Sequence, residues 1–80
     1  MHLRVYSLKK TLYEDEARAL NIRTTAGELT ILDLHRPLIA VLAEGDLKIT
    51  DRNDEERAIP AKGGFLEVRP GSNVTVLVRE

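Results

Sequence analysis

Apolar and polar residues alternate along much of the chain. The alternation is clearest near the end of the sequence, where Val74, Val76 and Val78 occupy every second position. Because successive side chains of a β-strand point to opposite faces, this period of two is typical of a half-buried strand. The whole pattern predicts strands at residues 2–8, 11–14, 17–24, 28–33, 38–43, 45–51, 57–62, 65–69 and 74–79.

Turn-forming residues separate these segments. Residues 69–72, Arg-Pro-Gly-Ser, suit a type II turn, because proline sets the first φ angle and glycine accepts a positive one. The charged stretch 51–57 reads as the solvated tip of a hairpin, with a docking patch as the alternative. Pro60 points to an edge position for the strand at 57–62. Eight or nine short strands favour a sandwich or a barrel.

The large aliphatic residues on the apolar face of each segment form the predicted core. They are Leu3, Val5, Leu20, Ile22, Leu29, Ile31, Leu47, Ile49, Leu66, Val68, Val74, Val76 and Val78.

The segment Leu38–Ala43 breaks the alternation, because it is apolar throughout. An uninterrupted apolar strand needs apolar cover on both faces, whereas a strand of a small sandwich normally exposes one face to water. Either a loop of this chain or another protein covers the second face, and the sequence leaves both possibilities open.

Composition narrows the function classes. The 80 residues correspond to one domain, and 12 Lys and Arg against 13 Asp and Glu give a net charge of −1. Phosphate binding needs clustered positive charge, so this balance argues against nucleic acid as a partner. The chain has no cysteine, and its longest apolar run is far too short to cross a bilayer. We therefore expect a soluble, cytoplasmic domain without direct membrane insertion.

Candidate chemistry is sparse. His35 has Asp33 two positions before it, but no cysteine or elbow serine stands nearby as a nucleophile, so it reads as a polar loop residue rather than a catalytic base. Two histidines are too few for a metal site with three or four converging ligands. Gly63 and Gly64 lead directly into strand residues, which favours a bulge or a close backbone approach over a phosphate loop. We expect no catalytic residue, cofactor or metal.

Five segments, read in order, resemble one known family. They are Ala-Gly-Glu-Leu-Thr-Ile at 26–31, His-Arg-Pro-Leu-Ile at 35–39, Gly-Asp-Leu-Lys-Ile at 45–49, Gly-Gly-Phe-Leu-Glu-Val at 63–68 and Asn-Val-Thr-Val-Leu at 73–77. With this spacing the chain resembles, over essentially its whole length, the N-terminal domain of the epsilon subunit of F-type ATP synthases.

The resemblance implies an all-β fold, a β-sandwich of two antiparallel sheets with eight to ten short strands. It also implies a non-catalytic subunit of the central stalk that links the gamma subunit to the polar loops of the membrane ring and couples ion flow to ATP synthesis. Carried onto this chain, Glu28 matches the family glutamate that faces the ring, and His35 with the corner at 37–38 matches the segment near gamma. The expected partner contacts are Glu28, His35, Arg36, Pro37, Leu38, Ile39 and Val41.

The sequence departs from the family pattern at three positions. Leu34 stands where Asn or Gly is usual, Arg36 where a small residue is usual, and Lys62 where Ser is common. The C-terminal helical hairpin of the family is not in the sequence, so we expect one domain over residues 1–80. The implied location is peripheral, at the cytoplasmic face of the inner or plasma membrane. The alternative function is a stand-alone β-sandwich module that binds a small ligand or carbohydrate, which the scarcity of aromatic residues disfavours.

Overall fold

The computed structural model describes residues 1–80 and contains eight strands and no helix. The strands are β1 (His2–Tyr6), β2 (Thr11–Thr24), β3 (Gly27–Leu32), β4 (Leu38–Leu42), β5 (Gly45–Asp51), β6 (Glu56–Ala61), β7 (Gly63–Arg69) and β8 (Asn73–Arg79). No helix is therefore present that could cross a membrane.

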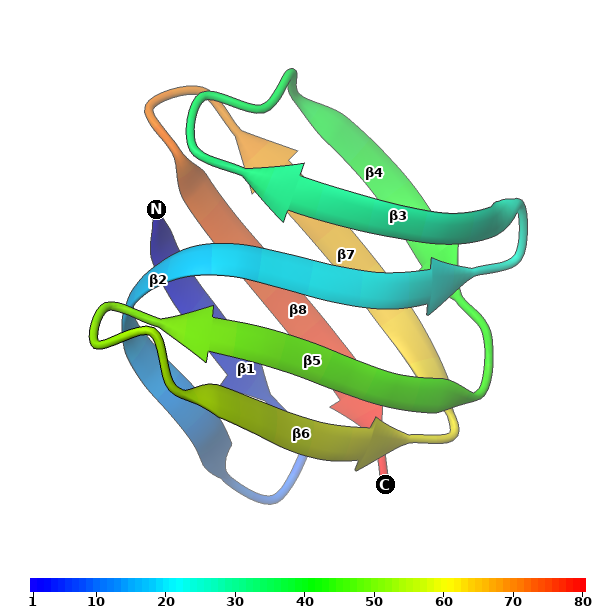
Figure 1. Ribbon diagram of the computed structural model, residues 1–80. Coiled ribbons are helices and arrows are strands. Elements are labelled where there is room, and N and C mark those ends of the chain that lie inside the picture. Colours follow the sequence, from blue (N-terminus) through cyan, green and yellow to red (C-terminus); the bar gives the residue numbers. More distant parts are fainter.

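The strands form two layers that face each other (Figure 1). The front layer has the order β3-β2-β5-β6, and the back layer has the order β1-β8-β7-β4, with the first part of β2 added beside β1. This arrangement confirms the predicted all-β sandwich. Neighbouring strands are antiparallel with one exception, since β1 and β8 run parallel, and the expectation of wholly antiparallel sheets is wrong for that pair.

Strand β2 belongs to both layers. Its first part pairs with β1, and its second part pairs with β3 and β5. The register with β5 shifts between Ala17 and Ala19, which is the signature of a β-bulge, and bulges bend a strand. The prediction of two separate strands at 11–14 and 17–24 is therefore wrong, because one 14-residue strand continues through the polar residues between them.

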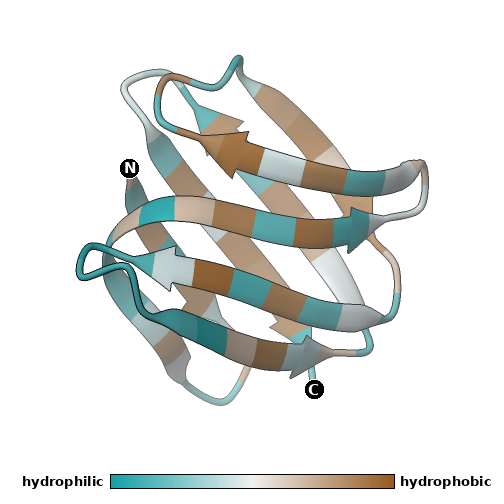
Figure 2. Ribbon diagram, viewed as in Figure 1, coloured by the Kyte–Doolittle hydropathy of each residue, from teal (hydrophilic) through white to brown (hydrophobic).

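The core lies between the two layers and is made largely of the aliphatic residues that the alternation predicts, together with Met1, Tyr13, Ala17, Leu42 and Ala61. Figure 2 shows the alternation as hydrophobic and hydrophilic bands along the strands. Leu3, Leu20, Ile31, Ile49, Leu66 and Val76 are completely buried. Of the predicted core residues only Leu29 is half-buried, and it packs against the others. Burying each large aliphatic side chain contributes roughly 1.5–3 kcal/mol, so this set supplies most of the driving force for folding.

The turn between β5 and β6 is organised by a buried carboxylate rather than being wholly solvated. The Oδ1 atom of Asp51 accepts hydrogen bonds from the backbone N–H groups of Asn53, at 2.9 Å, and Glu55, at 3.0 Å. Its Oδ2 atom accepts one from Nε of Arg57, at 3.3 Å. These bonds hold the pKa of Asp51 below its usual value, and the bond from the N–H of Glu55 has the largest effect. Burial alone would raise this pKa.

This carboxylate makes stability depend on pH in acid. Because the folded-state pKa is lower than the unfolded one, the ionised Asp51 stabilises the fold fully at neutral pH, and this stabilisation is lost as the pH falls below about 4 and through the folded-state pKa. We expect Asp51→Asn to have a lower thermal unfolding midpoint than the wild type at pH 7. The difference between the two midpoints should become smaller as the pH falls below about 4. An unchanged difference across that range would contradict the assignment.

Candidate interaction surface

A row of apolar side chains crosses the outer face of the back layer. The strand register places Val41 of β4 beside Phe65 of β7, Phe65 beside Leu77 of β8, and Leu77 beside Tyr6 of β1. Residues directly opposite each other in neighbouring strands share a face of the sheet. We call Tyr6, Val41, Phe65 and Leu77 the apolar row. Val41 is 47% exposed and Phe65 is 56% exposed, so nothing in this chain covers the part of the row that lies on β4 and β7.

The next row along the same face is mostly polar. It runs from Ile39 through Glu67 and Thr75 to Arg4. Ile39 is 76% exposed and enlarges the apolar row at its β4 end. At the other end the guanidinium group of Arg4 lies 4.9 Å from the centre of the Tyr6 ring, a cation–π distance. The outer face therefore changes from apolar to polar along the strands.

An open hollow of about 610 Å³ adjoins the apolar row. Leu8, Val41, Phe65 and Leu77 line it, and the glycine pair Gly63–Gly64 lies beside them. Leu8, in the turn between β1 and β2, is almost fully exposed. The charged residues at this hollow are Lys9, Glu44, Lys62, Arg79 and Glu80. An apolar hollow with a charged rim is the usual anatomy of a protein-binding site.

The outer face of the front layer is polar by contrast. Asn21 of β2 donates a hydrogen bond from Nδ2 to Oγ1 of Thr30 on β3, at 2.9 Å, and Lys48 of β5 is exposed beside them. Solvent-facing residues of an antiparallel sheet are normally of this kind. The two faces of the sandwich differ in character, and only the back layer carries an extended apolar surface.

The segment Leu38–Ala43 alternates in space although it does not alternate in sequence. Leu38 lies opposite the buried Val68, and its half-buried side chain packs against the core. Ile39 and Val41 point outward and are exposed. The sequence left open whether a loop of this chain or another protein covers the second face of this segment. No loop of this chain covers Ile39 and Val41. Partner binding through Ile39 and Val41 stays a prediction. Leu38 packs against the core on the inner side of the same strand.

The loop between β3 and β4 holds the next group of predicted contact residues. His35 is half-buried, and its Nδ1 atom lies 2.8 Å from the carbonyl oxygen of Arg36. Arg36 and Pro37 are exposed. Leu34 is 84% exposed and has φ 62°, the left-handed conformation that favours Gly or Asn. Its N–H donates to Oγ of Ser72 at 2.8 Å, which helps to hold the loop in this form.

Glu28 lies at the opposite end of β3 from this loop. It is exposed, its partner across the strand pair is Arg23, and it makes no ion pair. The predicted contact residues therefore form two separate groups. One comprises the loop after β3 and the outer side of β4, and the other is Glu28 alone.

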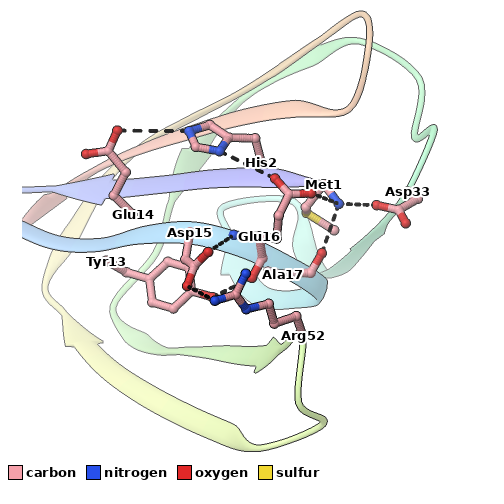
Figure 3. Close-up of polar contacts among 9 residues, drawn as sticks. All are labelled: Met1, His2, Tyr13, Glu14, Asp15, Glu16, Ala17, Asp33 and Arg52. Carbon is pink, nitrogen blue, oxygen red and sulfur yellow. Dashed lines mark hydrogen bonds and ion pairs between the residues drawn. The ribbon is translucent and has the colours of Figure 1, made fainter.

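A polar cluster surrounds the amino group of Met1 (Figure 3). This group donates a hydrogen bond to the carbonyl oxygen of Ala17, at 2.9 Å, and forms an ion pair with Asp33. Glu16 lies 3.9 Å away. The N–H of Ala17 in turn donates to the carbonyl oxygen of Met1, at 2.8 Å. These contacts hold the bend of β2 against the start of β1, which is a structural role.

Tyr13 belongs to the same region. Its hydroxyl group donates to the carbonyl oxygen of Glu16 at 2.8 Å, and burial raises its pKa. His2 lies 3.5 Å from Glu16 and 3.9 Å from Glu14, with all three side chains about half exposed (Figure 3). No group of three or more His, Cys, Asp or Glu residues has the geometry to hold a metal ion.

Sequence reasoning missed most of the apolar row. Tyr6, Phe65 and Leu77 each stand at the outward position of an alternating strand, where a single apolar residue is unremarkable. Their significance comes from the register, which brings residues from four strands into one line. Leu8 was missed because the pattern predicts a strand at 2–8, whereas β1 ends at Tyr6 and leaves Leu8 in the turn that follows.

Fold and surface together define a β-sandwich domain with one exposed apolar face. The family model that matches the chain over residues 1–80 is that of the β-sandwich domain of the ATP synthase delta/epsilon chain. The chain belongs to this family, and it corresponds to the N-terminal domain of the epsilon chain.

Individual relatives agree with this assignment. The chain is 42% identical over 77 residues to the ATP synthase epsilon chain of Bordetella parapertussis, covering 96% of this chain and 54% of that one. It is 40% identical to the corresponding chain of Psychrobacter arcticus, covering 96% and 55% respectively. The chain thus spans about half the length of the curated relatives that it matches.

Solved structures show the same fold. A chain of the mitochondrial ATP synthase of Euglena gracilis, in a structure of OSCP, F1 and c-ring, superposes with a TM-score of 0.94 at 23% identity, covering all of this chain and 51% of that one. A chain of the central stalk and c-ring of the Tetrahymena thermophila mitochondrial ATP synthase superposes with a TM-score of 0.83 at 20% identity, covering all of this chain and 63% of that one.

Proposed function

We propose that the chain is a non-catalytic subunit of the central stalk of an ATP synthase, at the cytoplasmic face of the membrane. In this role it links a gamma-type subunit to the membrane ring, so that ion flow through the ring is coupled to ATP synthesis. Membership of the epsilon family and the structural likeness to chains solved with a central stalk and c-ring support this proposal.

The observation that carries the proposal is the apolar row with the adjoining hollow. A domain of 80 residues gains stability by burying apolar side chains, yet this one leaves Ile39, Val41 and Phe65 substantially exposed on one face. Contiguous exposed apolar surface of this kind marks an interaction site. The gamma-type subunit is the occupant we assign to it. His35, Arg36 and Pro37 flank the same strand and complete the contact.

The proposal is tested by placing a charge in the apolar row. We expect Phe65→Asp to weaken binding to the gamma subunit of the same ATP synthase at least tenfold, or about 1.4 kcal/mol, because an unpaired carboxylate would be buried in the contact. The domain should remain folded, since Phe65 is 56% exposed in the free chain. Binding is measured by calorimetry and folding by circular dichroism.

Ala58→Asp is the matched control. Ala58 is exposed on β6, in the other layer, so this variant adds the same charge away from the proposed contact. Its affinity for gamma should equal that of the wild type. Equal affinity of Phe65→Asp and wild type would show that gamma binds elsewhere, and no binding by the wild-type chain would refute the proposed function.

A further inference from the structure

The two edge strands of the front layer differ in how they are protected. Strand β6 pairs only with β5, and it carries Pro60, which has no N–H to offer to another strand. Proline is a common means of blocking unwanted pairing at a sheet edge. Strand β3 pairs only with β2, and its six residues include no proline and no lysine. Its outer edge is therefore open to another strand (Figure 1).

The hydrogen bonds of β2 show which backbone groups of β3 lie on that open edge. The carbonyl group of Arg23 and the N–H of Thr25 hydrogen-bond to the backbone of residues 41–43, each at 3.0 Å, so both point away from β3. Backbone direction alternates along an antiparallel strand. Thr24, between these two residues, therefore directs its backbone groups toward β3, where it pairs with Gly27.

The alternation continues along β3 itself. Gly27, Leu29 and Ile31 direct their backbone groups toward β2, and the residues between them direct theirs away from the sheet. The outward backbone groups of Glu28 and Thr30 make no hydrogen bond to another part of the chain. These two residues form a short free edge, with an N–H and a C=O group on each of them.

Leu29 is the one predicted core residue that the sandwich buries only in part. It lies opposite the buried Ile22 of β2 and packs against the core, but it belongs to the strand at the open edge. Its side chain therefore has the core on one side and water on the other. A strand added to this edge would bind the free backbone groups and cover Leu29 at the same time.

We propose that two copies of this chain pair through their β3 strands, antiparallel, about a two-fold axis that passes between the two Leu29 residues. A two-fold dimer uses the same patch on both copies, and it is the commonest form of homo-oligomer. In this register Glu28 of each copy lies opposite Thr30 of the other, and each such pair exchanges both of its N–H···O=C bonds. Leu32, whose carbonyl group already accepts from the N–H of His35 at 3.2 Å, is not needed.

The side chains fit the same register. The two Leu29 residues form a non-hydrogen-bonded pair, in which facing side chains lie closest, so each covers the exposed part of the other. On the outer face Oγ1 of Thr30 accepts from Nδ2 of Asn21, at 2.9 Å, which leaves its O–H free to donate to the Glu28 carboxylate of the second copy. The two Glu28 side chains stand diagonally rather than opposite each other, and Arg23 beside each one offsets their repulsion.

Such a dimer does not depend on the proposed function. The contact is small, so association is weak and increases with concentration. The apolar row belongs to the other layer and stays uncovered in the dimer. A partner that binds at Glu28, by contrast, competes with self-association.

Disulfide crosslinking tests the register directly, because the chain contains no cysteine. The Cα atoms of a non-hydrogen-bonded pair lie about 4.5 Å apart, a distance that a disulfide can span. We expect oxidised Leu29→Cys to become a covalent dimer of twice the 9.0 kDa of the chain. Circular dichroism checks that this variant is folded.

The two matched controls place the cysteine elsewhere on an edge strand. In Thr30→Cys the two thiols lie diagonally across the axis, and in Ala58→Cys they lie on β6, outside the proposed contact. Both variants should crosslink at least tenfold more slowly than Leu29→Cys. Faster crosslinking at position 30 or 58 than at position 29 would overturn the two-fold axis at Leu29.

The wild-type chain provides a second readout that does not depend on a variant. We expect its sedimentation coefficient to rise with concentration, and amide hydrogen exchange at Thr30 to slow at least tenfold between dilute and concentrated samples. Exchange at Ala58 should stay the same, although its N–H, two residues before Pro60, also points outward. A wild-type chain that stays monomeric up to about 1 mM would overturn the inference.

Removing one backbone donor separates edge pairing from other modes of self-association. In Thr30→Pro the lost N–H is one that points away from β2, and proline is tolerated at such edge positions. We expect the dissociation constant of the dimer to rise at least tenfold in this variant and to be unchanged in Ala58→Pro. A Thr30→Pro chain that is folded and dimerises as the wild type does would show that the copies associate through another surface.

Discussion

Replacing Gly64 by alanine is expected to destabilise the domain more than the same replacement at any other glycine of the chain. A Cβ atom at this position would lie 1.9 Å from the carbonyl oxygen of Leu77, and backbone cannot rotate away as a side chain can. The φ angle of Gly64, 141°, is also one that alanine adopts only with strain. Relief requires separating β7 from β8, so we expect a loss of about 4 kcal/mol or more of a total of about 5–15 kcal/mol. Urea unfolding followed by circular dichroism measures this loss.

Gly27→Ala separates the two causes. Gly27 has φ 123°, but no atom lies within 4 Å of the Cβ that an alanine would add. Only backbone strain remains, which costs about 1–3 kcal/mol. If the two alanine variants lost the same free energy of unfolding, the close approach of β7 and β8 would not be the reason for the glycine at position 64.

The second large effect distinguishes two adjacent residues of β7. Leu66 is completely buried, so Leu66→Ala is expected to cost about 2–5 kcal/mol through lost burial and the cavity left behind. Phe65 points outward and is half exposed, so Phe65→Ala should cost less than about 1 kcal/mol although it removes more atoms. Thermal and urea unfolding of the two variants test this order. A larger loss for Phe65→Ala would mean that the outward face of β7 is covered within this chain.

The core of the sandwich was predictable because alternation is a local property. In β8 the period of two in Val74, Val76 and Val78 identifies the buried face without knowledge of any partner strand. The local pattern did not predict the extent of a strand where pairing with another strand determines it. The stretch 14–16 of β2 is polar because it is exposed, yet its backbone is held in the ladder with β1, so sequence alone breaks the strand into two.

Burial of a charge was likewise invisible to the pattern. Asp51 stands in a polar run that reads as a solvated tip, but two backbone N–H groups and Arg57 satisfy its carboxylate inside the turn. The apolar row could not be predicted either, since it exists only once the register of four strands is known. The resemblance to the epsilon family implied the partners and a partner contact at Glu28, which stay predictions, but it did not indicate that Phe65 and Leu77 are surface residues.

The parallel pairing of β1 with β8 has a consequence for how the chain reaches its native state. Strand β8 lies between β1 and β7, so the strand that comes last within this domain also completes the interior of the back layer. Contacts between residues so distant in sequence require closing a long loop first, and folds dominated by such contacts form slowly. Until β8 arrives, β1 and β7 each present an unpaired edge that can associate with other chains. During synthesis the domain therefore passes through an interval in which two strand edges of the back layer are open to other chains, and that interval ends only when β8 has emerged.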